Sequence, residues 1–216
     1  VPAAQALRLH PDVPLEYGAM SEPLACCIHG IDRAEIKVGD TVCVVGGGAI
    51  GLLLVQLAKL SGAAKVVLSE PNAIRREKAR QLGADLCIDP LSENSFAEYL
   101  EFVGGEGADV VIECAGNRAA VESAFRFVKR GATILLFSVP SVDATYALPL
   151  FDVYQKELTI RGTFVNPDTH QRAVELINSG RIQIAPILTH TFSLDELPEA
   201  IAMQTSPESI KVLVKA

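Results

Sequence analysis

A short apolar run that leads into three consecutive glycines constrains this chain more than any other feature. Residues 41–45 are mostly valine and run directly into Gly46, Gly47 and Gly48, with Gly51 following three positions later. Gly46, Gly48 and Gly51 thus match the pattern G-x-G-x-x-G. In that pattern the first glycine permits a tight turn, the second lets a phosphate approach the backbone, and the third lets a helix pack closely on the strand. The spacing predicts a strand, a turn and a helix that together bind a dinucleotide.

The residues that follow the glycines support this prediction. Apolar side chains recur at helical spacing up to Leu60, and the helix begins at Ala49 and Ile50, where its N–H groups would face the phosphates. A second strand over residues 65–69 ends at Glu70, which lies 19 positions after Gly51 (70 − 51). The pattern expects an acid there to bind the ribose hydroxyls. The alternatives are a glycine turn without a ligand, and a solvated acid at position 70.

Strand-like and helix-like segments then alternate along the chain. Further strands are expected at residues 86–88, 109–113, 133–137 and 158–164. Helices are expected between them: one capped by Asn72 and closed by Gly83, one over residues 96–103, and one from Val121 to Val128 that ends with the cations Lys129 and Arg130. This alternation is typical of an α/β fold with a doubly wound parallel sheet.

The two ends of the chain differ from this middle part. Residues 1–20 contain three prolines with little periodicity and are expected to form a linker or loop, followed by a helix from Ser21. Residues 169–216 show a helix, a strand, a short helix and another strand, and are expected to belong to a second structural layer. We therefore predict a linker and entry helix at 1–30, a dinucleotide-binding domain at 31–180 and a separate segment at 181–216.

Composition excludes several classes of protein. The chain has 216 residues and a net charge of −7, without a basic stripe, so nucleic acid is not expected as a partner. No apolar run reaches the ~18 residues that a membrane span needs. The five cysteines include no C-x-x-C pair, which favours a reducing cytoplasm. The opening Val1-Pro2 is not typical of a signal peptide and suggests a chain that starts inside a longer protein.

Several motifs in order carry a resemblance to a known family. They are Ser21-Glu22-Pro23-Leu24, the glycine turn at 46–51, Glu113-Cys114-Ala115-Gly116, residues 160–164 and the ending at 209–212. With these motifs the chain resembles the zinc-dependent medium-chain alcohol and polyol dehydrogenases, above all the sorbitol and threonine dehydrogenase branch. The resemblance implies a Rossmann domain joined to a GroES-like catalytic domain, to which the C-terminal segment would return. It also implies hydride transfer between a polyol or secondary alcohol and NAD.

The chain departs from that family in its metal ligands. The catalytic-zinc and structural-zinc ligands of the family lie in an N-terminal domain that has no counterpart here. The four histidines, His10, His29, His170 and His190, are scattered without ligand-like spacing. We therefore expect a cofactor-binding fragment that is inactive alone, with zinc only in the full-length enzyme. The alternative is a non-catalytic nucleotide-binding or structural module.

The resemblance also assigns positions around the cofactor. It places Arg75 against the adenine, and Cys114 and Ala115 at the crevice where the fourth strand ends. It places Val139, after the fifth strand, and Phe164-Val165, after the sixth, beside the nicotinamide. For each residue the alternative is an ordinary packing or surface role.

Three further expectations follow. Glu22 lies 24 positions before Gly46 (46 − 22), where polyol dehydrogenases place a carboxylate facing the zinc; a simple helix-capping acid is the alternative. NAD should bind better than NADP, because the 2′-phosphate would face the Glu70 carboxylate. The last strand of the sheet, at residues 158–164, should be an exposed edge through which the protein forms a homo-oligomer. Which alcohol is the substrate does not follow from these residues.

Overall fold

The computed structural model describes residues 6–215, which form two compact units. The sheet unit runs from Gly30 to Phe164. The terminal unit contains the described residues before Gly30 together with those from Val165 onward. Helix α1 (Ser21–Ala34) contributes residues to both units. The first five residues of the expected linker lie outside the described part of the chain.

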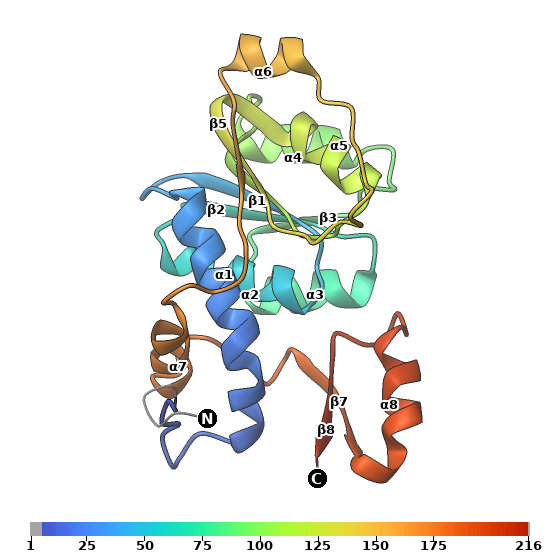
Figure 1. Ribbon diagram of the computed structural model, residues 1–216. Helices are drawn as coiled ribbons and strands as arrows, with labels where there is room; N and C mark the ends of the chain where they lie inside the picture. The colour runs from blue at the N-terminus through green and yellow to red at the C-terminus, as the bar shows by residue number, and fades with distance from the viewer. Residues whose placement is uncertain (1–5, 216) are drawn as a thin grey trace. The chain divides into compact units, whose positions relative to one another are not determined.

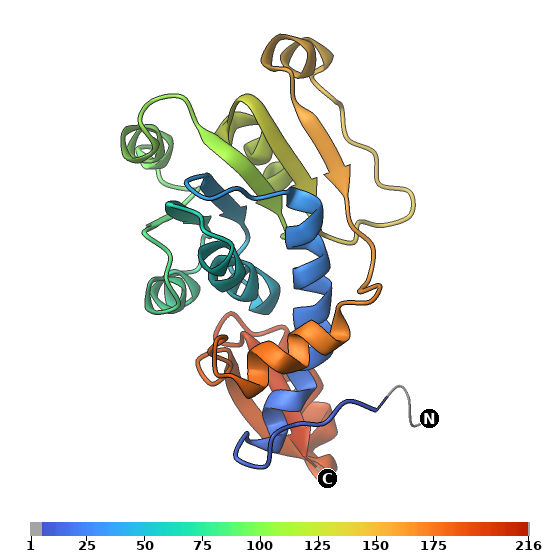
Figure 2. The ribbon, with the colours of Figure 1, turned by 90° about the vertical axis from the view of Figure 1, so that its left-hand side faces the viewer.

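The sheet unit is built on six parallel strands in the order β3-β2-β1-β4-β5-β6 (Figures 1 and 2). The strands are β1 (Thr41–Val45), β2 (Lys65–Ser69), β3 (Leu86–Ile88), β4 (Ala108–Glu113), β5 (Val128–Leu136) and β6 (Thr159–Gly162). Strand order reverses between β1 and β4, which is the arrangement of a Rossmann fold. The expected α/β fold with a doubly wound parallel sheet is therefore confirmed.

Helices cover both faces of this sheet. Helices α2 (Ala49–Leu60) and α3 (Ala73–Gln81) lie on one face, and α4 (Ser95–Val103) and α5 (Arg118–Phe127) lie on the other (Figure 1). The central strands are buried because both faces are covered, and their Val, Ile and Leu side chains form the core. On the face of α4 and α5 the core also contains two large aromatic side chains, Tyr99 and Phe127, whose ring centroids are 4.6 Å apart.

The boundary between α5 and β5 differs from the expectation. Helix α5 ends at Phe127 and β5 begins at the next residue, so Lys129 and Arg130 lie in the strand and not at the end of the helix. The carbonyl of Phe127 accepts the hydroxyl of buried Tyr99. Lys129 forms an ion pair with Asp109 at the start of β4. These tertiary contacts override the helical periodicity that extended the expected helix.

The terminal unit holds a second sheet, of two parallel strands, β7 (Leu188–Ser193) and β8 (Lys211–Lys215). The 3₁₀ helix η3 (Leu194–Glu196) and helix α8 (Leu197–Gln204) connect them. Helix α7 (His170–Asn178) precedes them and contacts the 3₁₀ helix η2 (Leu15–Met20). The separate sheet agrees with the expected second layer.

Three features of the ends and connections were not expected. The unit boundary lies at Phe164, not at residue 180, because α7 is held in the terminal unit: Thr169 donates to the carbonyl of Ala25 at 2.7 Å, and Asn178 accepts the N–H of His10 at 2.8 Å. Part of the expected linker is helical, as η2. Helix α6 (Leu150–Lys156), between β5 and β6, was missed because it buries no side chain and so has no core-facing pattern.

Candidate functional site

A cavity of about 510 Å³ opens at the carboxyl ends of the central strands of the sheet unit. Val45 and Ser69, which end β1 and β2, and Cys114, which follows β4, form its floor. The first turns of α3 and α5 and the loop after β3 complete its walls. Ligands of open α/β sheets bind at this place, where the strand order reverses. A second hollow, of about 300 Å³, lies along α5 and the segment before α6 and contains none of these strand ends.

The glycine turn forms one wall of the cavity and leaves room for a ligand. Gly46 has a φ of +109°, and a Cβ there would lie 3.0 Å from the Cβ of Ala115. A Cβ on Gly51 would lie 1.9 Å from the carbonyl oxygen of Gly46, so α2 packs directly on the turn. A Cβ on Gly48 would meet no atom within 4 Å. Gly48 therefore offers bare backbone at the start of α2, which suits a pyrophosphate.

Glu70 lies in the wall of the cavity and is only 4% exposed. Its two carboxylate oxygens accept backbone N–H groups, from Gly47 at 2.6 Å and from Asn72 at 2.8 Å. These bonds fix the carboxylate between the glycine turn and the start of α3. An ionised carboxylate accepts about four hydrogen bonds, so acceptor capacity for a hydroxyl pair remains.

The two arginines after Glu70 have different surroundings. The guanidinium of Arg76 donates to the carbonyls of Glu70 and Pro71, at 2.7 Å each, and pairs with Asp89 at 3.2 Å. The guanidinium of Arg76 is thus bound to the loops that follow β2 and β3. Arg75 lines the cavity itself, and its expected position against the adenine stays a prediction.

Cys114 and Ala115 line the cavity where β4 ends. The thiol of Cys114 donates to the carbonyls of Val45 and Gly46, at 3.3 Å each. Burial raises the pKa of Cys114, and the charge of Glu113 acts in the same direction. The thiol is therefore expected to stay protonated near neutral pH.

Sequence reasoning missed several residues at the site. Ser69 is 2% exposed, lies in the cavity wall, and has a hydroxyl without a hydrogen-bond partner in the described structure. Asn117 caps α5 by accepting the N–H of Ala120 at 3.0 Å, and both residues line the cavity. Glu113, which the sequence placed at the end of a strand and in a family motif without a role of its own, is fully buried. An asparagine directly after the glycine at a strand end was the available signal for Asn117.

The structure brings together six of the residues expected to bind the cofactor: Gly46, Gly48, Glu70, Arg75, Cys114 and Ala115 all line the cavity. Ala49, Ile50 and Gly51 form the first turn of α2 beside it. Val139 is 94% exposed and Phe164 is 81% exposed, and neither lines the cavity. Val165 belongs to the terminal unit, with a φ of +51°. The cofactor roles of all these residues remain predictions.

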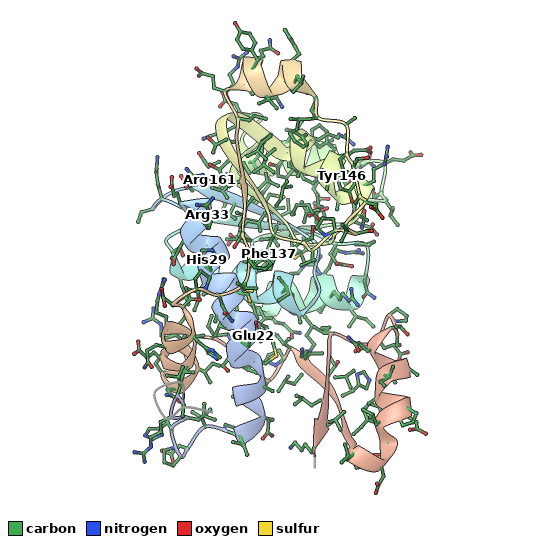
Figure 3. The ribbon with its side chains drawn as sticks, viewed as in Figure 1. Glu22, His29, Arg33, Phe137, Tyr146 and Arg161 are labelled. Carbon is green, nitrogen blue, oxygen red and sulfur yellow. The ribbon has the colours of Figure 1, made fainter. Side chains whose placement is uncertain are left out.

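Glu22 lies in the first turn of α1, in the terminal unit (Figure 3). Its Oε1 accepts from the amide of Asn166 at 3.1 Å and from the thiol of Cys26 at 3.3 Å. Burial, and then the bond to Glu22, raise the pKa of Cys26 to about 11. Within residues 6–215, no three His, Cys, Asp or Glu side chains are grouped closely enough to hold a metal. The described residues thus do not assemble a zinc site, and we derive no metal-dependent step from them.

Comparison with known proteins identifies the family. Residues 49–179 match the family model described as zinc-binding dehydrogenase. Sorbitol dehydrogenase of Gallus gallus is 34% identical over 215 residues, which cover 99% of this chain and 60% of the relative. A protein named as a zinc-binding dehydrogenase from Sinorhizobium meliloti 1021, solved bound to NADP, has a TM-score of 0.93 and 38% identity. The structural match covers 64% of that protein and all of this chain.

Another solved relative carries the other form of the cofactor. The alcohol dehydrogenase rspB of E. coli CFT073, complexed with NADH, has a TM-score of 0.88 and 25% identity, over 98% of this chain and 63% of its own.

Because the family model matches more than half of the chain, the chain belongs to the zinc-binding dehydrogenase family, a family of oxidoreductases with a nicotinamide cofactor. It spans about 60% of the length of the sorbitol dehydrogenase it matches. No helix within residues 6–215 is long and apolar enough to cross a membrane.

Proposed function

We propose that this chain is the NAD-binding portion of a zinc-dependent dehydrogenase that transfers hydride between a polyol or secondary alcohol and NAD. The observation that carries the proposal is the cavity at the strand ends, where a bare glycine turn faces the buried carboxylate of Glu70. The family match and the nicotinamide cofactors of two solved relatives support it.

We expect the residues of the cavity to bind the parts of a dinucleotide in a definite order. The pyrophosphate would lie over Gly48 at the N-terminus of α2, where no Cβ obstructs it. Glu70 would accept the hydroxyls of the adenosine ribose, and the unpartnered hydroxyl of Ser69 supplies a polar group on the same wall. The nicotinamide half would extend towards the ends of β4 and β5, since a dinucleotide spans the point where strand order reverses. The bound nicotinamide supplies the hydride acceptor.

We propose NAD as the preferred form. The carboxylate of Glu70 is fixed by Gly47 and Asn72, so it cannot turn away from a 2′-phosphate. Arg76, which could offset the repulsion, is already bound to two carbonyls and Asp89. Two unit charges about 4 Å apart repel by roughly 1 to 4 kcal/mol between water and a protein surface. Arg75 lines the cavity, and we expect its charge to offset part of this repulsion.

The substrate and the metal belong to the longer enzyme that the relatives represent. The name of the sorbitol dehydrogenase relative supports a polyol substrate. In a complete enzyme we expect Glu22 to face the zinc, and Glu22→Ala to lower metal occupancy or turnover while leaving NAD affinity intact. We propose a cytoplasmic location: all five cysteines lie in the described part of the chain and none is in a disulfide.

Binding and turnover measurements on the same preparation test the proposal. We expect the 216-residue chain to bind NADH, to contain no stoichiometric zinc and to show no turnover with sorbitol. A longer chain that includes the rest of the relatives' length should turn over polyols. Absence of NADH binding would refute the nucleotide-binding role. Stoichiometric zinc in the 216-residue chain would refute the proposal that the metal is bound only in the longer enzyme.

A further inference from the structure

Glu113 is a fully buried carboxylate immediately behind the cofactor cavity, and the proposed function does not use it. We propose that Glu113 is a positioning residue that sets the two loops around the nicotinamide half of the site. The proposal rests on the proposed function, because it concerns how the cavity is shaped for its cofactor.

Every polar group of Glu113 other than its N–H is directed at one of these two loops. Its Oε1 accepts the N–H groups of Ala115 at 2.8 Å and Gly116 at 2.7 Å, which belong to the turn between β4 and α5. Its Oε2 accepts the hydroxyl of Ser138, two residues after the end of β5. Its backbone carbonyl accepts the N–H groups of Phe137 at 2.9 Å and Ser138 at 3.2 Å. One residue therefore joins both turns.

The first of these turns is part of the cavity wall. Cys114 and Ala115 line the cavity, and Ala115 abuts Gly46 so closely that a Cβ on that glycine would lie 3.1 Å from the Ala115 nitrogen. A displaced turn would therefore press on the glycine turn or withdraw from the cofactor. The bonds from Ala115 and Gly116 to Glu113 add to those that Cys114 makes to Val45 and Gly46, and together they hold this turn.

The second turn follows β5, on the side of the sheet where the nicotinamide half is expected. Ser138 directly precedes Val139, the residue expected to flank the nicotinamide. The adenosine half is expected to rest on Glu70 and the loop after β2, whereas the carboxylate of Glu113 bonds only to the turns after β4 and β5. Loss of Glu113 should therefore weaken binding of the whole dinucleotide more than binding of its adenosine half.

Substitutions at Glu113 separate positioning from simple structural support. In Glu113→Ala we expect the NADH dissociation constant to rise at least about tenfold and the AMP constant by less than about threefold, because one half of the site loses its anchors. In Glu113→Gln the amide oxygen still accepts both N–H groups and the amide nitrogen donates to Ser138, so NADH affinity should recover to within about threefold. Ser138→Ala removes one bond only and should give a smaller loss for NADH and none for AMP.

Asp109 offers a matched control at the opposite end of the same strand. Its carboxylate accepts the N–H of Thr41 at 2.9 Å and pairs with Lys129, and it does not line the cavity. Asp109→Ala should lower the melting temperature without changing the ratio of NADH to AMP affinity. If Glu113→Ala does not fold, the NADH and AMP dissociation constants of Ser138→Ala decide between positioning and structural support.

The possible outcomes distinguish this proposal from the proposed function. If the unmodified chain binds no NADH, the proposed function fails. If it binds NADH and Glu113→Ala or Ser138→Ala weakens NADH and AMP equally, the positioning role is wrong. It is also wrong if Glu113→Gln binds no better than Glu113→Ala, or if NADH affinity is unchanged in Ser138→Ala.

Discussion

At the scale of single residues, this site depends on buried carboxylates held by backbone N–H groups. The spacing after the glycines indicated that Glu70 would follow the second strand, and it does so in the cavity wall. It could not predict that Gly47 and Asn72 would hold both carboxylate oxygens, or that Glu113 would hold a second turn in the same way. Such bonds depend on how two turns meet in space, and the linear pattern carries no information about that distance.

Substitutions at two glycines of the turn should change the stability of the fold and the affinity for the cofactor separately. Gly51→Ala would place a Cβ against the carbonyl of Gly46, so we expect a loss of at least roughly 1 to 3 kcal/mol in the free energy of unfolding. Gly48→Ala meets no atom, so its melting temperature should be unchanged, while its NADH affinity should fall by about tenfold or more because the Cβ occupies the phosphate position. Urea unfolding measures the stability of each variant, and fluorescence titration measures its NADH affinity. A Gly48→Ala variant with full affinity would contradict the assignment.

The thiol of Cys26 should respond to its carboxylate neighbour. Because the pKa of Cys26 is raised to about 11, little thiolate exists near neutral pH and alkylation should be slow. Glu22→Ala removes the negative acceptor, so the pKa of Cys26 should fall and alkylation at about pH 8 should become faster. Peptide mapping by mass spectrometry measures the rate. Cys87, whose pKa burial raises to about 11, is the internal control and should not change.

At the scale of elements, strands and capped helices were predictable, and segments shaped by tertiary contacts were not. Asn72 caps α3 as expected, by accepting the N–H groups of Ile74 and Arg75. The end of α5 was misplaced because its last carbonyl is held by Tyr99, which lies 28 positions away in sequence. Helix α6 was missed because its apolar side chains, among them Phe151 at 69% exposure, face no core.

The junction between α5 and β5 gives a test of this explanation. Tyr99→Phe leaves the buried carbonyl of Phe127 without its partner, so we expect a loss of about 1 to 3 kcal/mol in the free energy of unfolding. Tyr154→Phe, on exposed α6, should have no effect and is the matched control. Chemical denaturation of both variants measures the difference. Equal stabilities would mean that the hydroxyl does not secure the junction.

At the scale of the whole molecule, β6 is the exposed edge of the main sheet and pairs only with β5 among the described strands. Arg33 and Arg161 tie the end of α1 to this edge: Arg33 donates to the carbonyl of Gly162 at 3.3 Å, and Arg161 donates to the carbonyl of Arg33 at 2.8 Å (Figure 3). We propose that two copies associate through β6, because an open strand edge favours pairing. Light scattering should show dimers at high concentration. A strictly monomeric mass would rule this out for the 216-residue chain.

The central claim is that the cavity binds NAD and that Glu70 disfavours NADP. Calorimetric titration of the chain with NADH and NADPH, repeated on Glu70→Ala, tests it most directly. We predict that NADPH binds on the order of fivefold to a thousandfold more weakly than NADH, as a repulsion of roughly 1 to 4 kcal/mol implies, and that Glu70→Ala narrows the gap. Equal or tighter binding of NADPH by the unmodified chain, or no binding of either, would contradict this account of the site.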